Sequence, residues 1–599
     1  MKRNNVYIRM MLVAAMICGC FACDDEFLER YPQTSVAPPT FFKSVSDLEL
    51  YVNGLYSVNP RWEDMSSDNV TVSIDNQPYT GLLYGRVTPD NVSGDGWNWS
   101  FLRNVNLMLG NLDEVSGEAA DINHYVGIAR YLRARFYIGK VQIYSDVPWY
   151  DKELTTTDED LYKTQDPRTF VVDKIMEDLE FAVANIKPDM GNRTRMHKYV
   201  ALAELSRFAL YEGTYRKYHT ELELTGTANR FLERSVSASE EIMNSGNFEI
   251  TGTGVEELAQ GIAGCAGFRA LFSSAKLDGN REIIQWKEHG MFSFRIENRA
   301  NSLTESSRMI YSLSRSLQES FLTKDGKPFS TVADYDKKAY KDVFTDRDPR
   351  MAETFFWPGL GDEDATSPKT VPPSLGGYWQ SKYFTPYAAI LKAGDNTWQM
   401  TSLPVFRYGE VLLNYAEAKA ELGQLDAAAI NRSINLLRAR VNMPAFNAAN
   451  EVDATLRSLY PDVSDVNILA VRRERRVELA GEGLRQQDLY RWKAGKLYEA
   501  EISQQGVYIP SLPFAYDTNG DGLLDHGVAE TASKHIETDD PVVWYDLDDA
   551  TGLIYRDASG FIRIKDDQTR KFDEPKCYYT PIPTGQIVLN PNLKQPPGW

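Results

Sequence analysis

The chain has 599 residues, a formal net charge of −19 at pH 7 and a pI near 5.0. Hydrophobic residues make up 43% of it and charged residues 25%, which is typical of a folded globular protein large enough for more than one packed core. So much negative charge argues against nucleic acid or an anionic lipid surface as a partner of the folded body, and it favours neutral ligands.

The N-terminus has the pattern of an export signal. Lys2, Arg3 and Arg9 form a basic region, and the apolar run from Met10 to Gly19 is too short to span a bilayer. The run ends in small residues and cysteine, as in bacterial lipoprotein signals, in which the cysteine is acylated. We therefore predict a signal peptide over residues 1–22 and attachment to a membrane through acyl chains.

Most of the cysteines lie at this junction. Cys20 is preceded by the better peptidase pattern, whereas Cys23 is followed at once by three acids, so both are candidates for lipidation. A plain secreted protein is the alternative. Beyond residue 23 only Cys265 and Cys577 remain, so at most one disulfide could form and no disulfide scaffold is implied.

Aromatic residues make up 12% of the chain, more than a core requires, and exposed aromatic side chains suit planar or ring-shaped ligands. The segment SGDGWNWSFLRNVN combines a glycine-rich loop, two tryptophans and hydrogen-bonding groups just before a predicted helix. The candidate binding residues are Trp97, Asn98, Trp99 and Arg103, with Trp62 and Asp68 of RWEDMSSDN nearby. Alternatively, one of the two tryptophans wedges the helix start into the core while the other faces the opposite side.

Helical spacing dominates the middle of the chain. Tyr125, Ile128, Leu132 and Phe136 recur on one helical face, and two further helical segments follow. Small side chains such as Ala201 let neighbouring helices approach closely, as in stacked helix pairs.

A later segment predicts a helix hairpin. Apolar and aromatic residues repeat at helical spacing from Tyr408 to Leu422, the pattern breaks at Gly423, and it resumes from Asp426 to Arg440. Long polar or Gly/Pro-rich stretches separate the helical segments, and loops of such length are usually functional.

Other aromatic and charged residues are predicted to be structural. Trp149, Trp286 and Trp492 lie in apolar or helical contexts that favour the core. In RRERRVELAGEGLRQQDLYRW acids alternate with arginines, which predicts a buried or interfacial ion-pair network rather than a nucleic-acid patch.

One short segment resembles a calcium-binding loop. In DTNGDGLLD, oxygen-bearing side chains alternate around Gly522 as at the first positions of an EF-hand loop, but the final bidentate glutamate is missing. The candidate ligands are Asp517, Asn519, Asp521, the Leu523 carbonyl and Asp525. A structural Ca²⁺ and a plain turn both remain open, and no other cofactor is expected.

Catalytic motifs are not evident. The chain has only six histidines and carries no H-E-x-x-H, nucleophile elbow or phosphate-binding glycine loop. Carboxylate pairs are too abundant in so acidic a chain to be informative. We therefore do not expect an enzyme.

Several motifs together resemble those of the SusD/RagB family of Bacteroidetes surface lipoproteins. They are, in order, CDDEFLERYPQTS, RYLRARFYIGKVQIYSDVPW, FTDRDPRM, FRYGEVLLNYAEAKAELG, RRERRVELAGEGLRQQDLYRW and NPNLKQPPGW. The resemblance implies a mainly α fold, with four tetratricopeptide-like helix hairpins and an irregular, loop-rich ligand-binding half. It also implies an N-terminal helical region over 23–225 and a C-terminal region over 226–599 that pack as one unit.

The resemblance further implies a role. Members of the family are glycan-binding lipoproteins of the outer membrane that face the cell exterior. They capture oligosaccharides for a SusC-like TonB-dependent transporter, over which they act as a hinged lid. In relatives the loop at the position of Trp97 to Trp99 often contributes to the glycan site, and acids directly follow the lipidated cysteine, which favours Cys23. Peptide capture, as in RagB-like relatives, and a surface glycoside hydrolase are the alternatives.

Overall fold

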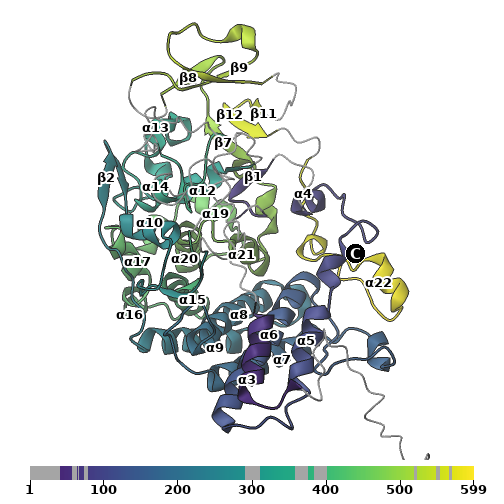
Figure 1. Cartoon of the computed structure of the whole chain (residues 1–599). Helices are drawn as coiled ribbons and strands as arrows, with labels where there is room; N and C mark the ends of the chain where they lie inside the picture. Colours follow the sequence, from purple (N-terminus) through teal and green to yellow (C-terminus); the bar gives the residue numbers. More distant parts are fainter. Residues whose placement is uncertain are drawn as a thin grey trace, which may run out of the picture.

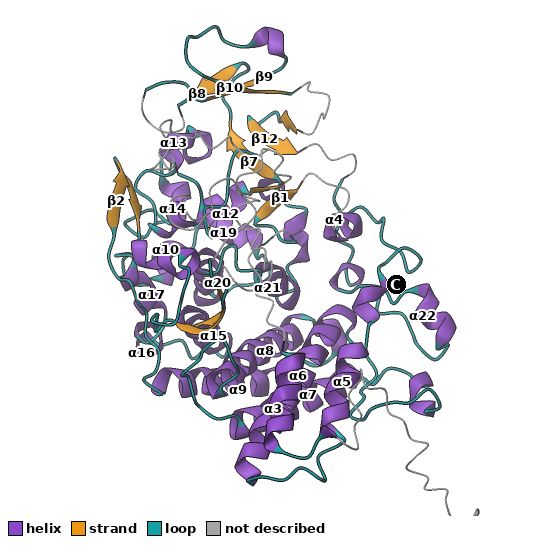
Figure 2. Ribbon diagram, in the orientation of Figure 1, coloured by secondary structure: helices purple, strands orange, loops and turns teal. Residues whose placement is uncertain are grey.

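The computed structural model describes residues 41–56, 64, 66–72, 78–289, 311–357, 376–383, 401–517, 522–547, 554–564 and 569–599. Helices dominate this part of the chain and the strands in it are few and short (Figure 1, Figure 2). The predicted mainly α fold is confirmed. The signal segment, Cys20 and Cys23 lie outside the described residues.

The first half of the chain forms a group of packed helices at the bottom of Figure 1. α6 packs along α7, and α8 packs along α9, as the predicted helix pairs require. Gly213 of α8 permits the second contact, because a Cβ at this position would lie 2.8 Å from the Leu232 side chain of α9. The helices are α3 (Val45–Leu55), α5 (Ser100–Leu109), α6 (Ala119–Tyr144), α7 (Arg168–Asn185), α8 (Lys198–Tyr218) and α9 (Ala228–Asn244).

A second group of helices continues this packing. α15 contacts α8, α9 and α20 and so joins the two groups. The predicted hairpin is present, but its second helix is interrupted, because Ser433 leaves the helical conformation and its hydroxyl donates to the Ala429 carbonyl at 2.6 Å. The helices are α15 (Tyr408–Glu421), α16 (Ala427–Asn431), α17 (Ile434–Arg440), α20 (Val466–Glu478) and α21 (Arg485–Arg491).

Shorter helices and small sheets fill the rest of the described chain. The helices are α4 (Pro78–Leu83), α10 (Ala266–Ser273), α12 (Arg315–Ser320), α13 (Tyr340–Val343), α14 (Arg350–Thr354), α18 (Ala448–Glu451), α19 (Ala454–Leu459) and α22 (Thr584–Leu589). Two-stranded sheets pair β1 (Val70–Val72) with β5 (Tyr311–Leu313), β2 (Glu256–Ala259) with β3 (Ile262–Gly264), and β4 (Ile283–Lys287) with β6 (Leu403–Arg407).

Two three-stranded sheets lie at the top of Figure 1. β12 (Phe561–Ile564) is the central strand between β7 (Gln505–Tyr508) and β11 (Ile554–Arg556). β9 (His526–Ala529) is the central strand between β8 (Phe514–Tyr516) and β10 (Val543–Asp546), and its pairing with β10 is parallel. The loop-rich half expected from the sequence is thus built on small sheets.

A network of buried ion pairs surrounds α20. Arg350 and Arg440 both bind Glu478, at 2.9 and 2.6 Å, and Arg407 binds it at 2.8 Å. Burial alone would raise the pKa of Glu478, but the three guanidinium groups hold it well below its usual range. The arginines of α20 are buried and paired in the same way, so the ion-pair network predicted for this segment is confirmed.

The structure also shows where the other tryptophans, the two remaining cysteines and the predicted domain boundary lie. Trp149, Trp286 and Trp492 are buried, as predicted. Cys265 and Cys577 are buried free thiols. The predicted boundary after residue 225 falls in the short connection between α8 and α9, two helices that pack along their length. In the described residues, no helix is both long and apolar enough to cross a bilayer.

Candidate ligand-binding site

The loop before α5 brings its two tryptophans together. Residues Gly94–Trp97 form a single 3₁₀ turn, and the Asn98 side chain then accepts a hydrogen bond from the amide of Ser100, the first residue of α5, at 2.8 Å. Trp97 and Trp99 consequently lie edge to face with ring centroids 5.5 Å apart. The two rings are in contact rather than on opposite sides, but Trp97 is buried in the core whereas Trp99 is half-buried, so the alternative that one tryptophan wedges the helix start into the core holds for Trp97.

Lys140 of α6 holds this loop in place. Its Nζ donates to the carbonyls of Gly96 at 2.5 Å and Asn98 at 3.0 Å, and it lies against the face of Trp99. Burial lowers the pKa of Lys140 to about 8. Trp97 packs against Tyr144 of the same helix, with centroids 4.8 Å apart, so α6 positions both tryptophans.

A cavity of about 500 Å³ opens beside the tryptophan pair. Its size lies within the range of small-molecule sites, roughly 300–1,000 Å³. Aromatic, aliphatic and polar groups share its wall, which is drawn from three distant parts of the chain. The lining residues are Trp97, Trp99, Ser100, Leu102, Arg103 and Asn106, then Pro148, Tyr150, Lys152, Leu154, Leu161 and Tyr162, then Gln586, Leu589, Asn590 and Leu593.

The aromatic groups differ in how far they reach the cavity. Trp97 is only 6% exposed and belongs mainly to the core, whereas Trp99 is half-buried. Tyr150 packs edge to face on Trp99 with centroids 5.5 Å apart. Tyr162 is 53% exposed and offers the largest free aromatic surface of the wall. Trp99, Tyr150 and Tyr162 therefore provide the faces on which a ring-shaped ligand could stack.

Hydrogen-bonding groups lie among these aromatic side chains. Arg103 is 64% exposed in its side chain and binds Glu153 through Nε at 3.0 Å and Nη2 at 2.9 Å. Asn106 donates to the carbonyls of Tyr150 and Lys152 at 2.9 and 3.1 Å. Its buried Oδ1 has no partner in the described part of the chain. An acceptor left unpaired in the wall suits a ligand hydroxyl.

Two segments distant in sequence close the far wall. The Asn590 amide donates to the Lys163 carbonyl at 2.9 Å, and the Asn592 amide donates to the Tyr162 carbonyl at 2.6 Å. These bonds attach α22 and the residues after it to the segment that carries Tyr162. They also leave Leu589 of α22 largely exposed at the edge of the cavity.

The predicted binding residues are only partly brought together. Trp97, Trp99 and Arg103 line the cavity, whereas Asn98 is exposed, does not line it and accepts a hydrogen bond from the Ser100 amide. Trp62 lies outside the described residues. Asp68 does not line the cavity: it is 2% exposed and pairs with Arg485 at 2.7 Å and Arg476 at 3.1 Å. Its inclusion among the ligand-binding residues is corrected, because those ion pairs occupy its carboxylate.

The calcium-like loop is partly outside the described chain. Asn519 and Asp521 fall in the undescribed segment 518–521. The Asp517 carboxylate accepts from the Gly522 amide at 2.9 Å, Leu523 is exposed and Asp525 is buried. In the described residues no group of three or more acidic, histidine or cysteine side chains could hold a metal. The calcium site stays a prediction.

Sequence reasoning missed several residues of the wall. Tyr150 follows Trp149 in DVPWYD, a segment interpreted as core, and Tyr162 lies in a polar stretch with no periodic pattern. Asn106 sits one helical turn beyond Arg103 and could have been included on spacing alone. Leu589 and Asn590 could not, since only the tertiary fold brings the C-terminal segment to the site.

Comparisons with known proteins agree with this architecture. A model of the SusD family matches residues 271–599, more than half of the chain. Among curated proteins, SusD-like protein P38 of Formosa agariphila is 24% identical over 523 residues, which cover 82% of this chain and 92% of that protein. SusD-like protein P2 of the same organism is 22% identical over 552 residues, covering 88% and 96%.

Solved structures are similar over nearly the whole chain. A SusD-like protein of Bacteroides fragilis superposes with a TM-score of 0.66 at 20% identity and covers 95% of this chain and 100% of its own. A SusD-like carbohydrate-binding protein of the same species superposes with a TM-score of 0.64 at 23% identity and covers 93% and 100%. At these identities the likeness establishes the fold.

Proposed function

The chain belongs to the SusD family, and from that premise we propose that it is a cell-surface lipoprotein that binds oligosaccharides without cleaving them. The cavity beside Trp99 is the proposed glycan site. Captured glycan would pass to a SusC-like TonB-dependent transporter, over which the protein acts as a hinged lid. Cys23, or Cys20, would carry the acyl chains that hold it to the outer membrane.

The composition of the cavity wall is the observation that supports glycan binding. Sugar rings have apolar C–H faces and a rim of hydroxyl groups. The wall offers Trp99, Tyr150 and Tyr162 for the faces, and Arg103 and Asn106 for the rim. Its charges are paired, since Arg103 binds Glu153 and Lys152 binds Asp160 at 2.8 Å. A neutral ligand therefore suits it better than an ion.

Modest affinity would suffice for this role. A Kd near 1 mM corresponds to about −4 kcal/mol. A polysaccharide that engages several neighbouring copies would raise the effective affinity by roughly 10² to 10⁴. Anchoring beside a transporter would keep the released ligand close to its route of entry.

Isothermal titration of the full chain against a panel of plant and host glycans tests the proposal. We expect a saturable heat for one glycan class and no release of reducing sugar on long incubation. In Tyr162→Ala the affinity should fall roughly 2- to 12-fold, since a stacked aromatic pair contributes about 0.5–1.5 kcal/mol. Tyr555→Ala is the matched control, because Tyr555 is also exposed but lies on β11, outside the cavity wall.

Three outcomes would contradict the proposal. Binding that Tyr162→Ala and Tyr555→Ala leave equally unchanged would place the glycan elsewhere. Heat from a peptide panel and none from glycans would favour peptide capture. Release of reducing sugar by the purified chain would identify a hydrolase.

A further inference from the structure

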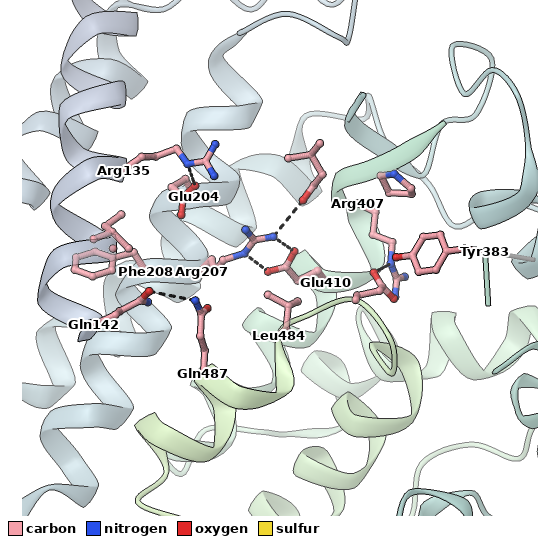
Figure 3. Close-up of a pocket in the computed structure, with 15 residues that line it drawn as sticks. Arg135, Gln142, Glu204, Arg207, Phe208, Tyr383, Arg407, Glu410, Leu484 and Gln487 are labelled. Carbon is pink, nitrogen blue, oxygen red and sulfur yellow. Dashed lines mark hydrogen bonds and ion pairs between the residues drawn. The ribbon is translucent and has the colours of Figure 1, made fainter. Parts of the chain in front are cut away.

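A second cavity, of about 140 Å³, lies between α6, α8 and the start of α15 (Figure 3). Figure 3 shows Arg135 and Gln142 of α6 facing Glu204 and Arg207 of α8, with Glu410, Leu484 and Gln487 across from them. None of the residues that line it lines the cavity beside Trp99. It is therefore a separate space.

The charged groups around this cavity are already paired. Arg207 binds Glu410 through two bonds of 2.6 Å, and Arg407 binds Glu482 at 2.7 and 2.8 Å. Arg135 lies 3.3 Å from Glu204. The wall holds three arginines and three glutamates, so it has no net charge and offers both hydrogen-bond donors and acceptors. Such a wall disfavours an ion and suits a neutral molecule that both donates and accepts.

A buried tyrosine also lines the cavity. Tyr383 is only 2% exposed, and its ring is held edge to face against Phe272. Its ring lies beside Arg407 in Figure 3. Burial holds the pKa of Tyr383 well above its usual range, so the hydroxyl keeps its proton and can donate to a ligand.

Gly139 of α6 keeps one side of the cavity open. It lies in the interior of a 26-residue helix, where glycine costs roughly 1 kcal/mol relative to alanine. No close packing requires it, since a Cβ at this position would meet nothing within 4 Å. Gly139 lines the cavity, so a longer side chain at this position would extend into the cavity and fill part of it.

We propose that this cavity is a second binding site, for a small neutral polyhydroxylated molecule such as a free polyol or the terminal unit of a glycan. An engineered cavity of about 150 Å³ holds benzene, so a space of this size encloses about six heavy atoms. A C3 polyol such as glycerol, which has six heavy atoms, fits inside completely, and a C4 polyol would extend into the mouth. A hexose would insert one edge and leave the other in the mouth, where the Arg135 side chain is partly exposed.

This proposal does not depend on the proposed function of the cavity beside Trp99. Loss of glycan binding in Tyr162→Ala would leave polyol binding here unaffected. Filling the second cavity would leave the aromatic site unaffected. The two can therefore fail separately.

Saturation-transfer NMR and titration of the full chain with glycerol, erythritol, xylitol, glucose and an oligosaccharide would test it. We expect saturable binding of at least one of these in the millimolar range. Gly139→Met, which fills the cavity, should abolish it. Gly54→Met is the matched control, because Gly54 also lies in a helix with open space around its Cβ but is exposed on α3.

The series also distinguishes the two sources of the ligand. Binding of free polyols identifies a small-molecule site, whereas binding of the oligosaccharide alone identifies a site for a glycan end. In Tyr383→Phe, affinity should fall roughly 2- to 12-fold, the effect of one hydrogen bond. Absence of saturable binding by every probe, or binding that Gly139→Met leaves intact while its thermal unfolding remains cooperative, would overturn the proposal and identify a water-filled cavity.

Discussion

The Nζ atom of Lys140 lies 4.8 Å from the centroid of the Trp99 ring. The same ammonium group donates to the carbonyls of Gly96 and Asn98, on either side of Trp97. One buried cation on α6 therefore holds the backbone that presents both tryptophans.

Lys140→Met should lower both stability and ligand affinity. The substitution leaves two carbonyls without their donor, which costs about 1–3 kcal/mol, and it frees Trp99 to change its orientation. Chemical denaturation and glycan titration measure the two effects. Lys174→Met, at a partly exposed lysine of α7 outside the cavity wall, should change neither. Unchanged affinity in Lys140→Met would show that the ligand does not use Trp99.

The stability due to Lys140 should depend on pH. Burial lowers its pKa from 10.5 to about 8, so the folded chain releases this proton at a lower pH than the unfolded chain does. Below about pH 8 both states are protonated and the folded state carries the full cost of burying the charge. Between about pH 8 and 10.5 the unfolded state binds more protons, so stability rises with pH.

Comparison with Lys140→Met isolates this effect. The free energy of unfolding of the wild type minus that of the variant should increase by at most about 1.4 kcal/mol per pH unit over this interval. Urea denaturation at several pH values between about 7.5 and 10 measures it. A difference independent of pH would mean that Lys140 is not desolvated.

Asp68→Asn should destabilise the protein without changing ligand affinity. Asp68 pairs with Arg485 at 2.7 Å and with Arg476 at 3.1 Å, and removing one partner of such a buried cluster costs about 3–5 kcal/mol. Asp151→Asn, at an exposed acid, is the control. A variant that folds normally but loses glycan binding would return Asp68 to the ligand site.

Asp68 should also contribute to acid sensitivity. Burial would raise its pKa, but Arg476 and Arg485 more than offset this and hold the pKa below its ordinary 3.8. Its stabilising contribution is therefore complete above that value and is lost as the pH falls through the lower pKa of the folded state. In Asp68→Asn the dependence of stability on pH should be weaker in this acid range.

Helical periodicity was sufficient to predict the principal helices. Tyr125 to Phe136 lie on α6, and Tyr408 to Glu421 form α15. The interruption of the second hairpin helix at Ser433 was not predictable, because it depends on whether the Ser433 hydroxyl bonds the Ala429 carbonyl. Alternating charge in α20 did predict buried ion pairs, because a long run of arginines and acids in a mainly helical protein can enter the interior only when paired.

The binding site was predictable only where it is local in sequence. Trp97, Trp99 and Arg103 lie within one segment and line one cavity. The relative orientation of the tryptophans depends on the 3₁₀ turn before them and on the turn at Asn98, which a simple alternation rule does not represent. Tyr162 and Asn592 are 430 positions apart yet hydrogen-bonded, and no pattern within either segment indicates the other.

Calcium should stabilise the protein if the loop from Asp517 to Asp525 binds it. A ligand at 100 times its Kd raises the free energy of unfolding by about 2.7 kcal/mol. Thermal unfolding of chelator-treated protein, with and without added Ca²⁺, measures the shift. Asp521→Ala should abolish it, whereas Asp539→Ala, at an exposed acid outside the loop, should not. An equal shift in both variants would remove the loop from consideration.

Trp97 and Trp99 should have different roles, Trp97 in stability and Trp99 in ligand binding. Trp97 is nearly buried against Tyr144, so Trp97→Ala should destabilise the protein by about 3–5 kcal/mol, the cost of truncating a large core side chain. Trp99 is half-buried and faces the cavity, so Trp99→Ala should lose less stability but more glycan affinity. Denaturation and titration of both variants decide the assignment. If Trp97→Ala keeps its stability and loses the ligand, the roles are reversed, and the ligand must enter on the Tyr144 side of the pair.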